Sequence, residues 1–318
     1  MMNFCSIDDV ADPIGWIGKA IELQKKIENG GPLDKSGKSI CLLFFNPSLR
    51  TRLSMQKAAF NLGIESFVFN LSSEGWQLEF EDGVVMNGSK SEHIVEAAGV
   101  ISSYFDAVGI RSFASLSDKA NDYAEQVLSQ FVKHCSIPVV NMESATLHPL
   151  QSFADMITIE EYKKVSKPKV VLTWAPHPKA LPQAVANSFL QWGNQMDYDL
   201  VVTHPQGYDL DPSMVGEAKV EYDQKKAFEG ADFIYAKNWS AFQDANYGQV
   251  VSQDMNWTVN QEKMNLTNDA KFMHCLPIRR NVIATDEVLD SDSSIIMPQA
   301  KHRITSAQMV LKEVLEIK

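Results

Sequence analysis

The sequence is poor in cysteine. Its 318 residues include four cysteines, Cys5, Cys41, Cys135 and Cys275, and no two of them form a Cys-x-x-Cys pair. Widely spaced cysteines of this kind are typical of a reduced compartment. The first residues, MMNFCSIDDVADP, contain no basic segment followed by an apolar run, which is the pattern of a secretory signal. We therefore predict a cytoplasmic protein.

Long apolar runs and an excess of positive charge are also missing. No run comes near the roughly 18 apolar residues that span a bilayer. The formal net charge is -11, and an acidic chain is a poor candidate for binding nucleic acid or an anionic membrane. We predict neither as a partner. If the substrates are anions, a few arginines and lysines must supply the positive charge locally.

The sequence motifs of several large enzyme classes are absent. There is no Gly-x-x-x-x-Gly-Lys-Ser/Thr loop and no Gly-x-Gly-x-x-Gly after a strand, which weakens the kinase and dehydrogenase interpretations. The histidines His148, His177, His204 and His274 lack the spacing of a His-Glu-x-x-His site. We predict a protein that needs no metal and no organic cofactor.

Short apolar runs bounded by turn residues recur along the chain, as buried parallel strands do. We predict strands at Ser39–Phe45, Ser66–Leu71, Ala107–Ile110, Pro138–Met142, Val170–Trp174, Leu200–Thr203, Phe233–Ala236, Phe272–Cys275 and Ile295–Met297. Helix-compatible segments separate these runs. The predicted fold class is therefore α/β, with two doubly wound parallel-sheet domains covered on both faces.

The two series of strands divide near residues 145–150, which predicts domains at residues 1–147 and 148–302. Two domains also suit the length, because a domain usually has about 100–200 residues. We predict a first helix capped by Ser6 and Asp9, a second over Thr51–Leu62 closed by Gly63, and a third over His148–Lys164. The last segment, Arg303–Ile317, is periodic enough to be a closing helix.

The loop Ser48-Leu49-Arg50-Thr51-Arg52 lies between a predicted strand and a predicted helix. The first amides of a helix have no partner inside the helix and attract anions. Two hydroxyls and two arginines beside them would complete a phosphate site. The alternative is that a hydroxyl caps the helix and the arginines are solvated.

Other strand ends carry further polar residues. Arg111 follows one predicted strand, Glu143 and the sequence His148-Pro149-Leu150-Gln151 follow another, and a third ends in His274-Cys275-Leu276-Pro277. Each feature alone has an ordinary explanation, such as a turn or a surface charge. Ligands of open α/β sheets bind beyond the carboxyl ends of the strands, so together these residues favour a site for a phosphate and an oxyanion.

These motifs, in this order, resemble the aspartate/ornithine transcarbamylase family over nearly the whole chain. The resemblance implies that residues 1–147, with the helix 303–318 packing back on them, bind carbamoyl phosphate, and that residues 148–302 bind the amine substrate. It also implies a homotrimer whose active sites are shared between subunits. By this likeness the residues that bind carbamoyl phosphate are Ser48, Leu49, Arg50, Thr51, Trp76, Arg111, His148, Gln151, Cys275, Leu276 and Arg303. Thr51, Arg111 and His148 would be the catalytic ones, because they would stabilise charge on the carbonyl oxygen.

The sequence departs from the ornithine enzymes of this family in the second domain. Their Ser-Met-Gly loop is missing, and Lys237 stands just after a strand where an acidic residue would meet an α-ammonium group. A cation suits a carboxylate or an acyl oxygen instead, so the α-amine of the substrate is expected to be acylated. A surface lysine on a loop is the alternative.

A second loop, from Ser72-Ser73-Glu74-Gly75-Trp76 to Lys90-Ser91-Glu92-His93, resembles the acylornithine branch of the family. In that branch the residues matching Trp76 and Ser91 reach a neighbouring subunit's site; a core position is the alternative for Trp76. The resemblance implies acylornithine contacts from Ser91, Glu143, His177, Lys237, Cys275 and Arg279. Ser91 is small and neutral, which favours a succinyl over an acetyl group, although Glu92 would repel succinyl if the register differed by one.

The sequence therefore predicts carbamoyl transfer from carbamoyl phosphate to the δ-amine of N-succinyl-L-ornithine in arginine biosynthesis. The products would be N-succinyl-L-citrulline and phosphate. N-Acetyl-L-ornithine is the alternative acceptor. Aspartate, putrescine and free ornithine enzymes are disfavoured by the missing Ser-Met-Gly and by His-Cys-Leu-Pro. A non-catalytic ligand-binding relative is the remaining alternative, which the complete set of motif residues disfavours.

Overall fold

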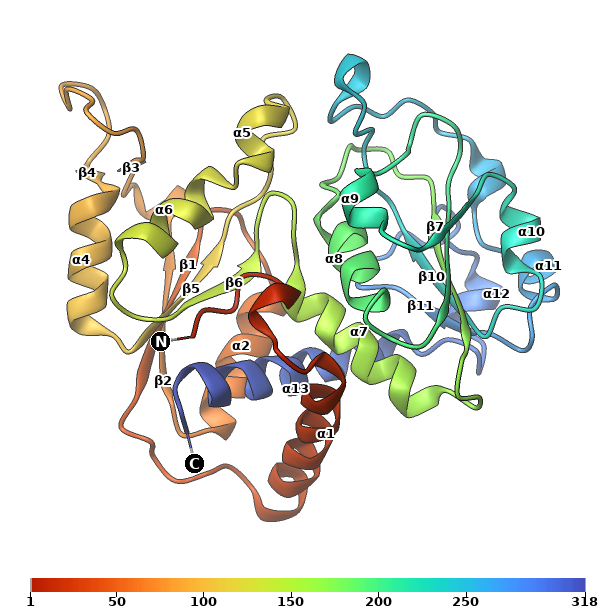
Figure 1. Ribbon diagram of the computed structural model, residues 1–318, viewed down its shortest axis with the longest axis horizontal. Coiled ribbons are helices and arrows are strands. Elements are labelled where there is room, and N and C mark those ends of the chain that lie inside the picture. The colour runs from red at the N-terminus through yellow and green to blue at the C-terminus, as the bar shows by residue number, and fades with distance from the viewer. Residues whose placement is uncertain (1, 318) are drawn as a thin grey trace. The chain divides into compact units, whose positions relative to one another are not determined.

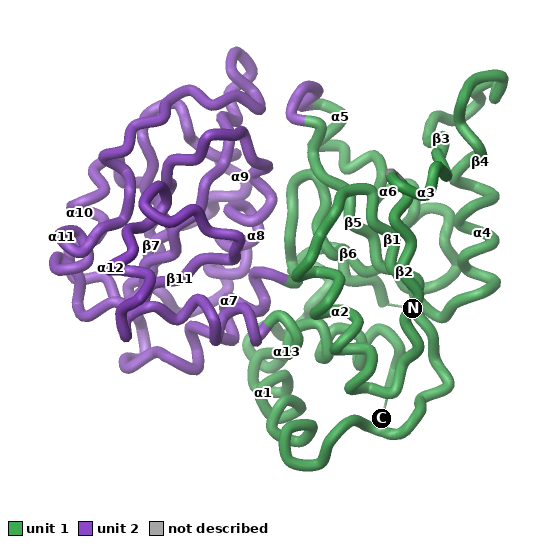
Figure 2. Tube along the Cα trace, turned by 180° about the vertical axis from the view of Figure 1, so that it is seen from behind, with its two compact units in different colours: residues 1–115, 120–150, 303–318 green, residues 116–119, 151–302 purple. Residues whose placement is uncertain are grey.

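The computed structural model describes residues 2–317, apart from the side chain of Ser72, and it divides into two compact units (Figure 2). Unit 1 comprises residues 1–115, 120–150 and 303–318, and unit 2 comprises residues 116–119 and 151–302. Each unit has its own parallel sheet with helices on both sides (Figure 1), so the predicted α/β class is confirmed. No helix in the described part of the chain is long and apolar enough to cross a membrane.

The main sheet of unit 1 has the order β2-β1-β5-β6, and all its neighbouring strands are parallel. These strands are β1 (Ser39–Phe44), β2 (Glu65–Asn70), β5 (Ala107–Arg111) and β6 (Val139–Glu143). The chain runs from β1 outward to β2 and then returns to β5 on the other side of β1. The strand order therefore reverses between β1 and β5, which is the point where open α/β sheets bind ligands.

Helices cover both faces of this sheet (Figure 1). On one face α4 and α6 contribute Ile94, Ala98 and Phe131 to an apolar cluster with Cys41 and Val108 of the strands. The helices α1, α2 and α13 lie together on the other side. The elements of unit 1 outside its main sheet are η1 (Ile7–Asp9), α1 (Pro13–Gly30), α2 (Arg50–Asn61), α3 (Leu71–Glu74), β3 (Leu78–Glu79), β4 (Glu92–His93), α4 (Ile94–Tyr104), most of α5 (Lys119–Tyr123), α6 (Gln126–His134), the start of α7 (Pro149–Tyr162) and most of α13 (Ile296–Val314).

The beginning of the chain differs from the prediction. Ser6 and Asp9 do form a reciprocal capping box, but the element that they cap is the short 3-10 helix η1. The longer helix α1 starts at Pro13, where the side chain of Asp12 accepts a hydrogen bond from the amide of Gly15. Proline at the first helical position needs no hydrogen-bond acceptor for its nitrogen, which explains the start at Pro13.

The sheet of unit 2 has the order β11-β10-β7-β8-β9, again with parallel neighbours. Its strands are β7 (Lys169–Trp174), β8 (Asp199–Thr203), β9 (Lys219–Glu221), β10 (Phe233–Lys237) and β11 (Lys271–Met273). The chain builds outward from β7 to β9 and then returns to β10 beside β7. Unit 2 thus has its own reversal of strand order, between β7 and β10.

The helices of unit 2 pack against both faces of its sheet. On one face Phe228, Met264 and Leu289 join Val171 and Ile234 in an apolar cluster. On the other face Phe153 of α7 stacks on Trp192 of α8, with ring centroids 5.0 Å apart. The elements of unit 2 outside the sheet are the rest of α7, α8 (Ala184–Gly193), α9 (Pro212–Val215), α10 (Gln224–Phe228), η2 (Asp244–Asn246), η3 (Met255–Trp257), α11 (Gln261–Met264), α12 (Asp286–Leu289) and the start of α13.

The predicted strand at Ile295–Met297 is wrong, because α13 begins at Ile296. Strand-like pairing ends just before it, where Ser294 bridges Phe272. A run of three apolar residues fits a buried helix as well as a strand. Pro298 lies in the first turn of α13, where a missing N–H costs nothing. The closing helix is therefore longer than the predicted Arg303–Ile317, and Arg303 lies inside it rather than at its start.

Candidate active site

The loop after β1 leads directly into the first turn of α2, as the sequence predicts. The first helical residue is Arg50, and no side chain caps the helix at Leu49. The hydroxyl of Ser48 accepts a hydrogen bond from the amide of Thr51 at 3.3 Å, so the capping role left open for a hydroxyl is present in part. The hydroxyl of Thr51 is buried and accepts a hydrogen bond from Nη2 of Arg303 on α13 at 2.8 Å.

Arg111 is the last residue of β5 and pairs with Phe44 at the end of β1. Its Nη1 donates to the carbonyl oxygens of Asn46 (3.3 Å) and Pro47 (3.0 Å), which ties it to the loop after β1. Burial lowers the pKa of Arg111, the charge of Glu143 opposes that shift, and the nearby charge of Arg50 adds to it. The location is therefore one in which a bound anion would offset a buried positive charge.

The Nε atoms of Arg50 and Arg111 are buried, and neither finds a hydrogen-bond acceptor among the described residues. A buried N–H group without an acceptor is costly, so most such groups in folded proteins are paired. Both donors belong to side chains that the sequence assigns to phosphate. An oxyanion between these two guanidinium groups would satisfy both.

Glu143 and His148 complete the cluster in unit 1. Oε2 of Glu143, the last residue of β6, accepts from Nη2 of Arg111 at 2.9 Å and lies 3.5 Å from Nε2 of His148. His148, immediately before α7, is 3% exposed. Unit 1 thus brings together Ser48, Arg50, Thr51, Arg111, Glu143, His148 and Arg303 near the reversal of its strand order.

Lys237 occupies in unit 2 the position that Arg111 occupies in unit 1, at the end of a strand beside the reversal of strand order. It is the last residue of β10 and pairs with Trp174 at the end of β7. The amide of Ala175 donates to the carbonyl of Lys237 at 3.1 Å, and the side chain of Asn238 donates to the carbonyl of Ala175 at 2.7 Å. These bonds hold the two strand ends together, and the Lys237 side chain is only 8% exposed.

His177 follows β7 and lies among three cations. Burial lowers its pKa, and the charges of Arg279, Lys237 and Lys179 lower it further. Nε2 accepts a hydrogen bond from Nε of Arg279 at 3.1 Å, and Nδ1 lies 2.9 Å from the carbonyl oxygen of Lys179 and 3.1 Å from its amide nitrogen. A neutral imidazole surrounded by three positive charges is suited to carboxylates and acyl oxygens.

The His274–Pro277 turn and Gln151 also belong to unit 2. Nδ1 of His274 accepts a hydrogen bond from the amide of Leu276 at 2.8 Å, and Leu276 has a positive φ of 58°. Cys275 is buried. Gln151 is 1% exposed and donates through Nε2 to Oδ1 of Asp155 at 2.8 Å. Hydrogen bonds within unit 2 therefore fix the positions of His274, Leu276 and Gln151.

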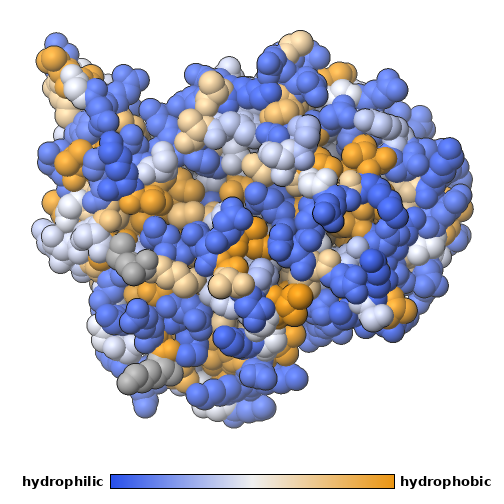
Figure 3. Space-filling view, in the orientation of Figure 1, coloured by the Kyte–Doolittle hydropathy of each residue, from blue (hydrophilic) through white to orange (hydrophobic). Residues whose placement is uncertain are grey.

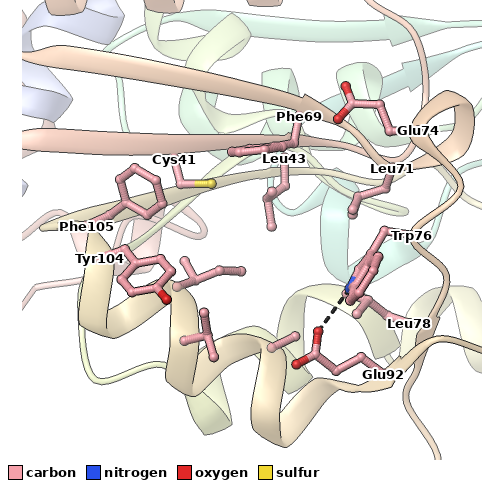
Figure 4. A pocket seen from close by; sticks show the side chains of 13 residues that line it. Cys41, Leu43, Phe69, Leu71, Glu74, Trp76, Leu78, Glu92, Tyr104 and Phe105 are labelled. Carbon is pink, nitrogen blue, oxygen red and sulfur yellow. Dashed lines mark hydrogen bonds between the residues drawn. The ribbon is translucent and has the colours of Figure 1, made fainter.

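Trp76 and Ser91 belong to unit 1, and among the described residues neither forms a hydrogen bond with Arg50, Arg111 or His148. Trp76 is 52% exposed, so the core interpretation of this residue is wrong. It lines an apolar pocket of about 410 Å³ in unit 1, together with Phe69, Tyr104 and Glu92, and its Nε1 donates to Oε2 of Glu92 at 2.9 Å (Figure 4). Ser91 is exposed, and its amide donates to the carbonyl of Gln77 at 2.8 Å.

Two family models match consecutive parts of this chain. The carbamoyl-phosphate-binding domain of aspartate/ornithine carbamoyltransferase matches residues 3–161, and the aspartate/ornithine-binding domain matches residues 182–314. The chain belongs to the aspartate/ornithine carbamoyltransferase family. The prediction that it is a carbamoyltransferase is thereby confirmed.

Curated relatives within this family differ in how similar they are to the chain. N-Succinylornithine carbamoyltransferase of Bacteroides thetaiotaomicron is 54% identical over 316 residues, covering 99% of both chains. N-Acetylornithine carbamoyltransferase of Xanthomonas axonopodis pv. citri is 39% identical over 287 residues, covering 84% of this chain and 83% of that one. Ornithine carbamoyltransferase of Ruegeria pomeroyi is 31% identical over 284 residues, covering 86% and 83%. Of these three relatives, the two acylornithine enzymes are more identical to the chain than the ornithine enzyme.

Solved structures of carbamoyltransferases superpose on the whole chain. Acetylornithine transcarbamylase complexed with acetylcitrulline has a TM-score of 0.89 and 34% identity, covering 99% of both chains. A glutamate-to-serine variant of N-acetyl-L-ornithine transcarbamylase, complexed with carbamyl phosphate and N-succinyl-L-norvaline, has a TM-score of 0.89 and 35% identity, covering 98% of this chain and 99% of that one. The carbamoyltransferase fold thus extends over both units.

The sequence analysis missed residues that hold the candidate site in place. Asn46 accepts from the amide of Phe113 at 2.7 Å, and the Phe113 ring lies 4.2 Å from the guanidinium carbon of Arg111. The position of Asn46 directly after β1 could have identified it. Asp155, one helical turn after Gln151, could have been found from that spacing.

Proposed function

We propose that this protein transfers the carbamoyl group of carbamoyl phosphate to the δ-amine of N-succinyl-L-ornithine, as a step of arginine biosynthesis. The products are N-succinyl-L-citrulline and phosphate. The observation that carries the proposal is the presence of two cationic groups, each at the reversal of strand order in its own sheet. The 54% identity to an N-succinylornithine carbamoyltransferase over 99% of both chains supports the choice of acceptor.

Carbamoyl phosphate would bind to the cationic group of unit 1. The first amides of α2, the hydroxyls of Ser48 and Thr51 and the guanidinium group of Arg50 would receive the phosphate. Arg111 would reach both the phosphate and the carbamoyl oxygen, and its unpaired Nε donor supports this role. His148 would donate to the same oxygen, and Arg303 would add charge beside Thr51.

The reaction requires only positioned donors and a good leaving group. The neutral δ-amine forms a bond to the carbamoyl carbon, and negative charge develops on the carbonyl oxygen. Arg111, His148 and Thr51 stabilise that charge, and holding both reactants together removes much of the entropic barrier. The bond from carbon to the phosphate oxygen then breaks, and the phosphate takes the proton that the amine loses.

The acylated amino acid would bind to the cationic group of unit 2. N-Succinyl-L-ornithine has two carboxylates, whereas free ornithine presents an α-ammonium group that Lys237 and Arg279 would repel. His177 stays neutral and accepts from Arg279, which leaves other N–H donors of that guanidinium group for a carboxylate. The free amino acid is therefore a poor fit to this group.

Ser91 supports succinyl over acetyl. An acidic residue at this position would repel the succinyl carboxylate, and serine does not. Glu92, the neighbour that could take this repelling role, is already bonded to Nε1 of Trp76 at 2.9 Å. The glutamate-to-serine variant of an acetylornithine enzyme, solved with N-succinyl-L-norvaline, suggests that one such change makes room for the larger group.

The purified protein should be supplied with carbamoyl phosphate and, in turn, ornithine, N-acetyl-L-ornithine and N-succinyl-L-ornithine. We expect the ureido product to form fastest with the succinyl substrate. Faster turnover of the acetyl substrate would overturn the choice of acyl group. Turnover of free ornithine alone would overturn the acylated acceptor altogether.

Ser91→Glu provides the corresponding test of selectivity. A carboxylate near the succinyl carboxylate should raise the KM for N-succinyl-L-ornithine at least tenfold and change the KM for N-acetyl-L-ornithine little. Steady-state kinetics with both substrates measure the ratio. Ser103→Glu, a serine on α4 in the same unit, is the control. An unchanged ratio in the Ser91 variant would remove this residue from the specificity determinants.

Part of the proposal is a homotrimer in which each site receives residues from a neighbouring copy. The segment joining β3 and β4 projects from unit 1 and has hydrophobic residues at its tip (Figures 1 and 3). Val85 there is 76% exposed, and Trp76 and Tyr104 at the apolar pocket are 52% and 73% exposed. Large exposed apolar groups of this kind favour burial against another chain.

The compartment is also part of the proposal. The four cysteines lie in the described part of the chain as free thiols. Burial raises the pKa of Cys5 and of Cys41 to about 12, so both thiols stay protonated and unreactive. Free buried thiols suit the reducing cytoplasm, which is where we place the protein.

A further inference from the structure

The side-chain amide of Gln151 has a defined orientation. Its Nε2 donates to Oδ1 of Asp155 at 2.8 Å, whereas its buried Oε1 accepts no hydrogen bond from any described residue. The whole residue is 1% exposed, so solvent does not explain this arrangement. A buried amide oxygen of this kind is complementary to an N–H donor of a ligand, and the amino group of a carbamoyl group is such a donor.

Asp155 explains why the amide has this orientation. An amide can rotate by half a turn and exchange its donor and acceptor ends, and both orientations have almost the same shape. Oδ1 of Asp155 acts as an acceptor here, so it selects the orientation that presents Nε2 rather than Oε1. Asp155 is 0% exposed and lies four residues after Gln151 on α7, so the helix itself brings the two side chains together.

The same carboxylate orients a second amide. Nε2 of Gln299, on α13, donates to Oδ1 of Asp155 at 2.7 Å. The opposite end of that amide, Oε1, accepts the backbone N–H of His274 at 2.8 Å. The turn begins at His274, whose Nδ1 accepts a hydrogen bond from the backbone amide of Leu276. Asp155 therefore fixes Gln299, and Gln299 fixes the backbone of this turn.

A third group faces Asp155 from the sheet. The hydroxyl of Tyr235 on β10 lies beside both Asp155 and Cys275, and burial together with these two neighbours raises its pKa well above the usual range. Tyr235 is 0% exposed and stays a phenol, and its hydroxyl forms no hydrogen bond to a described residue. The carboxylate of Asp155 thus has polar neighbours from α7, α13 and β10, all within unit 2.

We propose that Asp155 is a positioning residue for carbamoyl transfer, acting through two amides. Through Gln151 it turns a carbonyl oxygen toward the amino group of carbamoyl phosphate. Through Gln299 it holds the His274–Leu276 backbone, whose carbonyl oxygens would face the substrates. The inference rests on the proposed function, and it assigns to Asp155 no contact with the substrates themselves.

The first test is a paired substitution. Asp155→Asn keeps the shape but offers an acceptor and a donor, so the orientation of Gln151 is no longer enforced; we expect kcat to fall at least tenfold. Gln151→Glu places two carboxylates side by side, and we expect it to lower kcat more than Asp155→Asn does. In the double variant the amide at 155 can donate to the carboxylate at 151, whose other oxygen still accepts from the carbamoyl amine. We expect the double variant to be at least tenfold more active than Gln151→Glu alone.

Three controls separate the possible outcomes. Asp269→Asn removes an exposed carboxylate that pairs with Lys164 in the same unit, and it should have wild-type kinetics. Thermal melting should show that Asp155→Asn remains folded at the assay temperature. If it does not fold, Gln299→Met tests the second arm alone, and we expect at least a fivefold loss of kcat/KM for carbamoyl phosphate.

Either of two results would overturn the inference about Asp155 and leave the proposed function intact. One is wild-type kcat and KM in folded Asp155→Asn or, where that variant does not fold, in Gln299→Met. The other is a double variant no more active than Gln151→Glu, because a purely structural role for Asp155 predicts no rescue. Absence of carbamoyl transfer in the wild-type protein would overturn the proposed function, and the inference with it.

Discussion

At the scale of single residues, the chain concentrates positive charge at two places within an acidic molecule. The formal net charge is -11, yet Arg50, Arg111 and Arg303 gather in unit 1 and Lys237 and Arg279 in unit 2. Arg111, Arg303 and Lys237 are buried, and burying positive charge is unfavourable unless it is compensated. An anionic ligand would compensate the charge of each group.

Arg50→Ala should weaken carbamoyl phosphate binding by about 10- to 100-fold, because a charge-assisted hydrogen bond contributes about 1.5–3 kcal/mol. Titration calorimetry with carbamoyl phosphate, and with inorganic phosphate, measures the change. Arg52→Ala is the matched control, since Arg52 lies on the same helix but is exposed. Equal affinities in the two variants would contradict the phosphate assignment of the loop.

Lys237→Met should raise the KM for N-succinyl-L-ornithine at least tenfold and leave the affinity for carbamoyl phosphate within twofold. The substitution removes a buried charge while keeping most of the side-chain volume. Lys225→Met serves as the control, because Lys225 forms an exposed ion pair with Glu262 in the same unit. A normal KM in the Lys237 variant would show that the acyl substrate binds elsewhere.

Sequence reasoning found the residues at strand ends and missed those that support them. Arg111 and Lys237 could be predicted because ligands bind where parallel strands end. Both turned out to be the last residue of a strand, so the prediction was close in position. Gln299 and Asp155 are 144 residues apart, and only the folded chain brings them together.

At the scale of elements, the turn between α2 and β2 depends on glycine. Gly63 has a φ of +66°, and a Cβ there would lie 2.1 Å from the carbonyl oxygen of Asp34. We expect Gly63→Ala to destabilise unit 1 by more than about 2 kcal/mol, from backbone strain and this clash together. Urea denaturation measures the loss. Gly88→Ala is the control, because no atom lies within 4 Å of its added Cβ; equal stability of the two variants would refute the argument.

Element boundaries were predicted well where apolar runs were long and poorly where they were short. The predicted helix over Thr51–Leu62 corresponds to α2, Arg50–Asn61, and the strand Ser39–Phe45 to β1, Ser39–Phe44. The run Ile295–Met297 failed because three residues carry no periodicity that separates helix from strand. Ile295 is buried, as residues of both buried strands and buried helices are, so its apolar character could not separate the two.

At the scale of the whole molecule, the exposed apolar groups of unit 1 predict self-association. Light scattering should give a mass about three times the 35.6 kDa of one chain. Tyr104→Glu should shift the protein toward smaller species and lower its activity. Tyr222→Glu, at an exposed tyrosine of unit 2, should do neither. A monomeric wild-type protein with full activity would contradict the trimer and its shared sites.

The helix α13 fixes the relative directions of two of its own side chains. Gln299, which anchors the His274 turn, and Arg303, which contacts Thr51, are four residues apart on one continuous helix. Each residue of an α-helix advances the direction of the side chain by about 100°. Inserting or deleting one residue between them would point one anchor away from its partner. A change in the length of this helical turn should therefore harm the protein more than a change in the length of a surface loop.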